Sequence, residues 1–243
     1  PAMRLSQLLA SMKDASGRVR IDGFYADVVP LTARERAAVD ALPKNDAELM
    51  RELQFGEPEG GGRMLADLIN EPSLNIRGLR SAYVGDESQN VVPDRAMASC
   101  DVRLVKNVDP DRQFARVLAH IEKQGYFVAP DREPTPEERR THARVARLDY
   151  GGGYPATRTS MDLPVSAAVA RVLDEALGGG VVKAPTLGGS VPMHLFDRLG
   201  LPVIGVPIVN YDNSQHSHNE NLRLGHFWRG IDTYAALIAA LRW

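Results

Sequence analysis

Three consecutive glycines, Gly151-Gly152-Gly153, separate two parts of the chain that have different sequence patterns. Glycine runs interrupt regular secondary structure and favour hinges and loops. Before them, amphipathic helix patterns alternate with strand patterns, whereas the part after them has one helix pattern, short apolar runs and a closing amphipathic helix. We therefore predict an α/β fold in two domains, residues 1–157 and 158–243.

The first part predicts several elements from local signals. Apolar spacing predicts a helix at its start, and Thr32 to Glu35 forms a capping box that opens another. Asn45 to Glu48 is expected to open a helix in the same way. Further expected elements, in chain order, are a short strand at 18–21, a helix at 63–69, strands at 73–84 and 95–105, a helix from Asp109 to Gly125, a loop at 130–140 and a strand at 142–149.

Strict alternation in the 95–105 run predicts a strand with one small apolar face and one polar face. Cys100 lies on the apolar face and is expected in the core. The single cysteine excludes an internal disulfide. His120 and His226, at or near helical positions, are expected to be solvated, whereas His142 and His194 receive no firm role.

In the second part, the pattern predicts a helix at about 165–176, a short strand around Val181 and a buried strand from Pro202 to Ile208. A polar loop with His216 and His218 follows. The closing helix carries its apolar residues on one side.

Composition narrows the classes of function. The net charge is −2 with acidic and basic residues mixed along the chain, so no electrostatic footprint for nucleic acid is present. No apolar run is long enough to span a bilayer. No phosphate-binding glycine motif opens a helix, which disfavours a nucleotide site.

His216 is the candidate for chemistry, because loops past the carboxyl ends of strands collect functional residues in α/β sheets. Zinc needs three or four ligands, and the His216/His218 pair supplies two at most. A solvated loop histidine therefore remains an alternative. A serine hydrolase using Ser190 and His216 is a third possibility, although the chain lacks a G-x-S-x-G nucleophile elbow.

Three motifs together resemble one known family: G-G-S-V-P at 188–192, the run L-P-V-I-G-V-P at 201–207, and H-S-H-N-E-N-L at 216–222. They are similar to the C-terminal end of the dinuclear zinc hydrolases that include aminoacylase, carboxypeptidase G, succinyl-diaminopimelate desuccinylase and carnosinase. The resemblance implies that His216 is the last metal ligand. It assigns Glu220 a supporting role and not that of general base. The family's other zinc ligands and its base have no counterpart in this chain, so no catalytic residue is assigned here.

The same resemblance points to residues that bind substrate. Asn90 matches an N-x-x-P position near the substrate, and Arg103 in D-x-R matches an arginine that binds a substrate carboxylate through its two-pronged guanidinium. Gly189 and Ser190 match a turn that can hold the carboxylate or the oxyanion. The alternatives are a solvated surface arginine and a simple turn before a helix.

For the whole chain, the resemblance implies a lid domain at 1–157, with helices on a four-stranded antiparallel sheet and its first strands missing, followed by the C-terminal part of a catalytic domain. It implies a zinc-dependent amidohydrolase for dipeptides or N-acyl amino acids, a homodimer formed through the lid, and a cytoplasmic location. The chain begins inside a helix and matches only the second half of the family pattern. It is expected to be inactive alone, since it lacks most of the metal ligands and the general base. The alternative is a dimerisation or binding module without chemistry.

Overall fold

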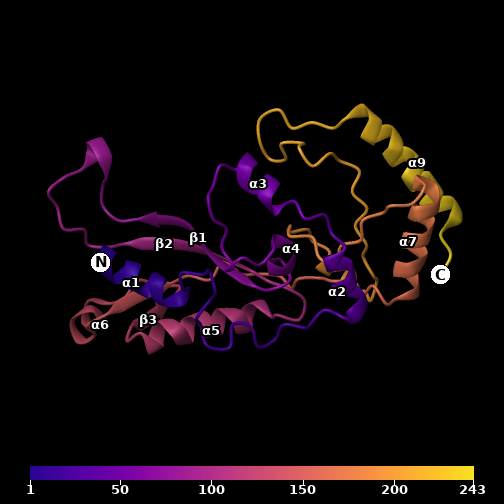
Figure 1. Cartoon of the computed structure of the whole chain (residues 1–243). Helices are drawn as coiled ribbons and strands as arrows, with labels where there is room; N and C mark the ends of the chain where they lie inside the picture. Colours follow the sequence, from indigo (N-terminus) through magenta and orange to yellow (C-terminus); the bar gives the residue numbers. More distant parts are fainter. The chain divides into compact units, whose positions relative to one another are not determined.

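The computed structural model describes every residue from 1 to 243, and the chain divides into two compact units. The first unit comprises Pro1–Pro30 and Lys44–Thr157, and the second comprises Leu31–Pro43 and Arg158–Trp243. The predicted mixed α/β class is confirmed, with helices and small sheets along one chain (Figure 1). The Leu31–Pro43 segment, expected with residues 1–157, is part of the second unit.

The first unit contains helices, a short 3-10 turn and four strands. In chain order they are α1 (Ala2–Met12), α3 (Asp46–Glu52), α4 (Leu65–Leu68), β1 (Ser73–Arg80), η1 (Gly85–Glu87), β2 (Met97–Arg103), α5 (Pro110–Lys123), β3 (Phe127–Pro130), α6 (Pro136–Thr141) and β4 (Val145–Leu148).

The strands form two separate two-stranded sheets instead of the expected four-stranded antiparallel sheet. β1 and β2 are antiparallel, with Ser73 opposite Arg103 and Arg80 opposite Met97. β3 and β4 are parallel, because α6 lies between them in sequence and carries the chain back to the same end. The predicted strand at 18–21 is reduced to a single bridge between Lys13 and Val19.

Both sheets of this unit pack on one apolar core. Ala98 and Val102 of β2 face that core, as the alternation predicts. Cys100, expected on the same face, is exposed. Its partner Ile76 on β1 is also half exposed, and the pairing register shifts just beyond it, so the ribbon leaves the core at this point. The fully buried members of the core are Leu8, Leu9, Met12, Val19, Ile21, Phe24, Leu74 and Ile121.

His120 on α5 is buried, so the expectation of a solvated histidine was wrong. Its Nε2 lies 2.9 Å from the Ser11 hydroxyl, which itself donates to the carbonyl of Leu8 at 2.6 Å. Because the serine proton is committed to that carbonyl, Nε2 is the donor and the pair is a structural contact. Burial lowers the pKa of His120; Asp22 nearby raises it and Lys123 lowers it further.

Local capping explains one helix that sequence patterns missed. Thr135 and Glu138 form a complete capping box and start α6 inside the segment expected to be a loop. Hydrogen bonding to Arg132 lowers the pKa of Glu138 to about 2. Conversely, Asn45 does not cap α3, and the carboxylate of Asp46 accepts a bond from the Leu65 backbone instead.

The second unit is built from helices α2 (Ala33–Asp40), α7 (Pro164–Leu177), α8 (His194–Asp197) and α9 (Leu224–Ala240). α7 and α9 pack against each other, and α7 ends at Gly178 in the left-handed conformation. The predicted capping box of α2 is present, with the Thr32 hydroxyl accepting from the Glu35 backbone and the Glu35 carboxylate accepting in return.

Glu35 also joins α2 to the rest of the second unit. It is 1% exposed, and its carboxylate lies 3.4 Å from the guanidinium of Arg158, which is 8% exposed. A buried charge is tolerated only when it is paired, so this ion pair ties the Leu31–Pro43 segment to the start of the 158–243 segment.

The expected strands around Val181 and from Pro202 to Ile208 are not present. No neighbouring strand is available in the second unit to complete a ladder. Side chains hold the 202–208 run instead: the Thr159 hydroxyl accepts from the Val203 amide at 3.0 Å and donates to its carbonyl at 2.6 Å, and the Tyr234 hydroxyl donates to the Val206 carbonyl at 2.8 Å.

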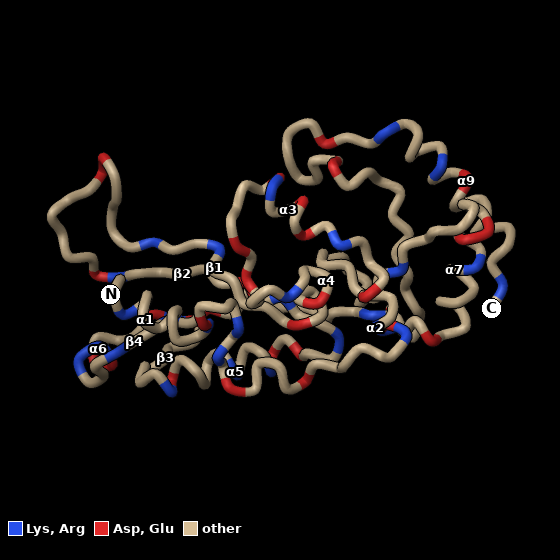
Figure 2. The backbone as a smooth tube through the Cα atoms, in the orientation of Figure 1, with Lys and Arg blue, Asp and Glu red and all other residues tan.

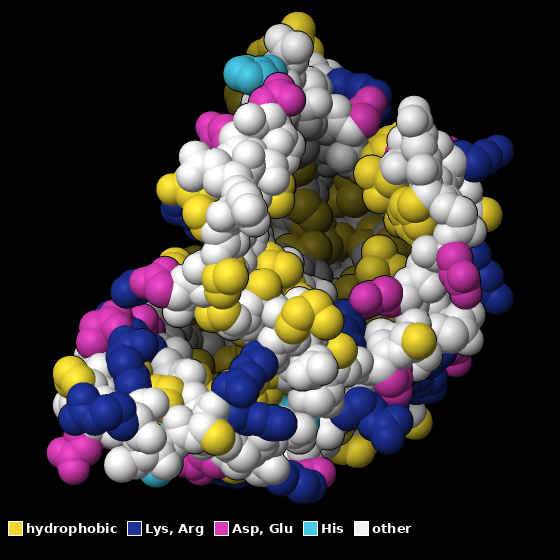
Figure 3. Space-filling view, turned by 90° about the vertical axis from the view of Figure 1, so that its left-hand side faces the viewer, with side chains coloured by type: hydrophobic (Ala, Val, Ile, Leu, Met, Phe, Trp, Pro, Cys, Tyr) yellow, Lys and Arg dark blue, Asp and Glu magenta, His cyan; other side chains and the backbone are white.

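Charge is spread over both units. Lys and Arg alternate with Asp and Glu along the backbone (Figure 2), and the face shown in Figure 3 mixes both signs with exposed hydrophobic side chains. No helix combines the length and apolar character needed to cross a bilayer.

Candidate functional site

His216 lies in a loop that leaves the 202–208 run and returns to the start of α9. Its side chain is exposed and makes no hydrogen bond, so the imidazole is available to a ligand. The serine–histidine pair with Ser190, which the serine hydrolase alternative would need, is therefore not formed. His218 is exposed as well.

The loop is closed by polar contacts at its base. Asn210 is 2% exposed, and its amide bonds to the side chains of Asp212 and Asn221 and to the Arg223 backbone. Farther up, the Asn221 backbone amide donates to the Asn213 carbonyl at 2.9 Å. The segment 210–223 is therefore a compact loop held by its own side chains.

Three non-glycine residues in this loop have left-handed backbones: Ser214 (φ 54°), His216 (φ 62°) and Asn219 (φ 62°). Such conformations are costly for residues with a Cβ atom and persist only where the surroundings impose them. His216 is thus held in a fixed and locally unfavourable backbone geometry, which is common at binding sites.

Glu220 contacts the backbone of the candidate ligand. Its carboxylate accepts a bond from the His216 amide at 3.4 Å. Asp212 at the base has a lowered pKa, first through the hydrogen bond from Asn210 and also through the charge of Arg223. Glu220 thus has a geometry suited to the supporting role that the sequence suggested.

Gly189 and Ser190 lie in an exposed loop ahead of α8. No atom lies within 4 Å of the position of a Cβ at Gly189, so this segment is open to solvent on that side. They belong to the second unit with His216, whereas Asn90 and Arg103 belong to the first.

Arg103 is the last residue of β2, and Asp101 orients it through an ion pair of 2.7 Å. Its side chain is 54% exposed. Asn90 lies in the exposed loop beyond the opposite end of the same ribbon (Figure 1). Seven residues of β2 at about 3.4 Å each separate those ends by about 20 Å, so the two side chains do not meet within one copy.

The residues present supply one candidate zinc ligand and do not make a metal site by themselves. No group of three or more His, Cys, Asp or Glu side chains is placed to hold a metal ion. A zinc site needs three or four such ligands, so the donor set of this chain does not fit zinc on its own.

Two features of the site were missed in the sequence. The buried Asn210 amide has no helical or strand period to mark it, although the polar run N-Y-D-N directly after an apolar run is a signal for a loop neck. The Glu35–Arg158 pair joins residues far apart in sequence, and no local pattern indicates it.

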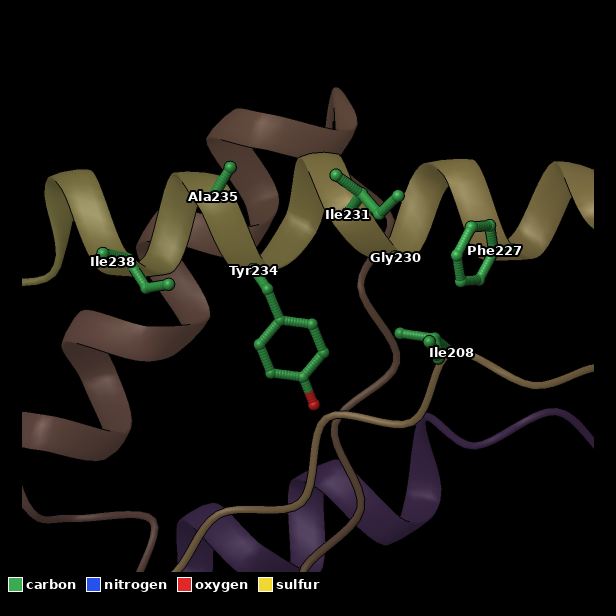
Figure 4. Close-up of a pocket in the computed structure, with 7 residues that line it drawn as sticks. All are labelled: Ile208, Phe227, Gly230, Ile231, Tyr234, Ala235 and Ile238. Atoms are coloured by element: carbon green, nitrogen blue, oxygen red, sulfur yellow. The ribbon is translucent and has the colours of Figure 1, made fainter.

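Apart from this loop, the second unit has an open apolar groove of about 410 Å³ along α9. Ile208 and the α9 residues Phe227, Ile231, Tyr234 and Ile238 line it (Figure 4). These helix residues are the predicted apolar stripe of α9, and they remain substantially exposed.

A protein family and several curated proteins match most of this chain. Residues 27–240 match the family described as Peptidase family M20/M25/M40. The Cys-Gly metallodipeptidase DUG1 of Saccharomyces cerevisiae is 26% identical over 98% of this chain and 48% of its own length, and the mouse Beta-Ala-His dipeptidase is 25% identical over 99% and 47%. The chain therefore spans about half the length of the curated relatives that it matches.

Two solved structures superpose on nearly the whole of this chain. An M20 family metallo-carboxypeptidase, Sso-CP2 from Sulfolobus solfataricus, superposes with a TM-score of 0.79 at 26% identity, covering 99% of this chain and 52% of that one. Human carnosine dipeptidase 1 superposes with a TM-score of 0.70 at 22% identity, over 99% and 49% of the two chains, which shows the shared fold.

Proposed function

Because the chain belongs to peptidase family M20/M25/M40, we propose that it forms part of a metal-dependent enzyme that cleaves dipeptides or N-acyl amino acids with a free carboxylate. The observation that supports this most is His216. Its imidazole is exposed and free of side-chain partners, which leaves both ring nitrogens open to a metal ion, and its backbone is held in a strained loop. We assign zinc as the metal on the family's behaviour, with the remaining ligands and the general base supplied from outside these 243 residues.

Four residues take the substrate in this proposal. Arg103 binds the carboxylate, since a guanidinium already oriented by Asp101 loses little freedom on binding. Gly189 and Ser190 offer a backbone amide and a hydroxyl to the carboxylate or the oxyanion. Asn90 approaches the same substrate from its own loop.

The separation of Asn90 from Arg103 favours a homodimer. A dipeptide extends over about 7 Å, far less than the length of the β1–β2 ribbon. If both side chains contact one substrate, Asn90 comes from a second copy. We therefore propose a dimer through residues 1–157, the lid domain of our assignment. The assignment of 158–243 to a catalytic domain and the cytoplasmic location stay predictions.

A second candidate is a binding or dimerisation module without chemistry. The two-stranded β1–β2 sheet leaves both strands without a further neighbour, and Ile76, Leu79 and Met97 on it are exposed. Such edges favour pairing with another copy. This candidate predicts a dimer whose metal affinity does not depend on His216.

Zinc titration of the purified chain separates the two candidates. We expect weak zinc binding by the chain, reduced about tenfold or more in His216→Ala, because this substitution removes the assigned ligand. His142→Ala is the matched control, since this exposed histidine stacks on Phe127 in the first unit and has no assigned ligand role. Comparison with His218→Ala decides whether the neighbouring histidine also binds.

We expect that the chain alone does not hydrolyse Cys-Gly, β-Ala-His or N-acetyl amino acids. Substantial hydrolysis by a preparation of verified mass and purity would contradict the assignment of the other ligands to residues outside this chain. Zinc affinity unchanged in His216→Ala would contradict the metal-ligand role and favour the binding module.

A further inference from the structure

We propose that Asn210 is a positioning residue for His216: its side-chain amide closes the 210–223 loop and so fixes the backbone from which the imidazole projects. The role of His216 itself rests on the proposed function. The positioning by Asn210 is a separate claim about the loop, and it can be tested without metal or substrate.

Burial singles out Asn210 in its segment. Its neighbours Val209 and Tyr211 are 50% and 79% exposed, whereas Asn210 is 2% exposed. A buried amide is costly unless its polar atoms are paired. A polar residue that alternates with exposed apolar neighbours is placed by its hydrogen bonds and not by hydrophobic packing.

The pairing of this amide is complete and reaches both arms of the loop. Its Nδ2 group donates to Asp212 Oδ1 at 2.9 Å and to Asn221 Oδ1 at 3.0 Å, and its Oδ1 accepts from the Arg223 backbone amide at 3.0 Å. Asp212 lies on the outgoing arm, and Asn221 and Arg223 lie on the returning arm. One side chain therefore joins the two arms at their base.

The chemistry requires an amide at this position. Two of the contacts need a donor and the third needs an acceptor, and only asparagine or glutamine offers two donors and an acceptor from one terminal group. An aspartate would retain the acceptor and lose both donors, and it would place a second carboxylate beside Asp212. The Asn210–Asp212 contact also lowers the pKa of Asp212, which keeps that acceptor ionised.

The closed base has a specific task, because the loop above it is strained. Ser214, His216 and Asn219 have left-handed backbones and would relax if the arms separated. Two other contacts also join the arms, the bond from the Asn221 backbone amide to the Asn213 carbonyl and the ion pair of Asp212 with Arg223. Both depend on Asn221 or Asp212, whose side chains accept hydrogen bonds from Asn210. The contacts farther along the loop are local: Gln215 to the Asn213 side chain, and His216 to Glu220. Opening of the base would therefore release His216 from its observed backbone geometry.

A simpler role must be distinguished. Arg223 is the N-cap residue of α9, so Asn210 could serve only to anchor the start of this helix. That role predicts effects on α9 alone. The positioning role predicts effects on 211–222 and on the signals of His216.

The test uses the full chain without metal. Amide hydrogen exchange measured by mass spectrometry reports on peptides covering 211–222 and α9, and ¹H–¹⁵N correlation spectra report on the backbone amide of His216. In Asn210→Ala we expect exchange in 211–222 to rise about tenfold or more, since the bonds that close the base are lost. We expect the backbone amide signal of His216 to move toward that of an unstructured chain, because its left-handed backbone would relax. Asn70→Ala, which truncates a buried asparagine of the first unit, is the matched control and should leave both readouts unchanged.

A swapped pair makes the test specific to these hydrogen bonds. Asn210→Asp alone should open the loop as Asn210→Ala does, although it preserves size. The double variant Asn210→Asp, Asp212→Asn exchanges donor and acceptor between these two positions and retains the acceptor for the Arg223 backbone amide. It does not restore the donor to Asn221 or the ion pair of residue 212 with the Arg223 side chain, so it should restore part of the protection and move the His216 signals part of the way back. Asp212→Asn alone completes the cycle.

Two outcomes would overturn the proposal. One is faster exchange in α9 with 211–222 and the His216 signals unchanged, which would leave Asn210 as a helix anchor only. The other is a double variant no better protected than Asn210→Asp. Neither outcome bears on zinc binding by His216, which the titration of His216→Ala tests independently.

Discussion

At Gly230, helix α9 passes close to Ile208 of the 202–208 run. A Cβ atom at Gly230 would lie 2.8 Å from Cδ1, 3.0 Å from Cγ2 and 3.1 Å from Cβ of Ile208. The last of these atoms cannot be moved by rotating a side chain, so Gly230→Ala must push the backbone of the run away from the helix. Gly225 in the same helix has no atom within 4 Å of its Cβ position and is a matched control.

Helix propensity and overpacking act in opposite directions on the free energy of unfolding of Gly230→Ala. Alanine is favoured over glycine in a helix by up to about 1 kcal/mol, and both substitutions gain part of this. Overpacking costs about 1–3 kcal/mol, and only Gly230→Ala incurs it. We therefore expect Gly225→Ala to be neutral or slightly stabilising and Gly230→Ala to be about 1–3 kcal/mol less stable than Gly225→Ala.

Urea unfolding measures this difference. The only tryptophans, Trp228 and Trp243, both lie in the second unit, so their fluorescence follows its unfolding, and circular dichroism follows the helices. Ile208→Ala removes the two side-chain atoms that lie closest to the Cβ of residue 230. In the Gly230→Ala background it should therefore recover about 1 kcal/mol of the free energy of unfolding. Equal stability of the two alanine variants, or no coupling with Ile208, would refute the close packing of α9 on this run.

Two further substitutions test buried titratable side chains, Glu35 and His120. Glu35→Ala should destabilise the second unit by about 3–5 kcal/mol, because it leaves Arg158 buried without this carboxylate. Glu138→Ala breaks the equivalent capping box on the exposed helix α6 of the first unit and should cost clearly less when unfolding is followed by circular dichroism. His120 has a folded-state pKa below its unfolded value of about 6.5, so its contribution to stability is complete above that pH and is lost as pH falls toward the folded pKa. His120→Gln should flatten the rise of stability with pH below about pH 6.5, and an unchanged slope would contradict burial of a neutral imidazole.

Local signals in the sequence predicted the helices well, because caps and apolar spacing act within one or two turns. The capping box of Thr32 and Glu35, the proline after Asp109 at the start of α5 and Gly178 after α7 are all at the expected places. The α6 capping box was equally local and was overlooked because prolines and charges dominate that segment.

Strands and burial were predicted less well, because both depend on distant partners. The Pro202–Ile208 run has the composition of a buried strand, but a strand needs a neighbour, and Thr159 and Tyr234 hold its backbone instead. The burial of His120 was not predicted for the same reason, since the Ser11 hydroxyl that accepts its hydrogen bond is more than a hundred residues away in sequence. His216 was found through its motif, whereas Asn210 became visible only when its three hydrogen bonds were known.

The assignment of Leu31–Pro43 to the second unit has a consequence for how the chain assembles during synthesis. This segment leaves the ribosome before Arg158 and α7, with which it shares a unit and which follow only after more than a hundred further residues. The first unit can therefore fold before α2 has its partners, and the second unit folds last. The contact between α2 and Arg158 spans a long stretch of sequence, and such long-range contacts slow folding. A fragment cut at residue 158 would lack Glu35, and an exchange of domains between relatives at that boundary would separate α2 from its own unit.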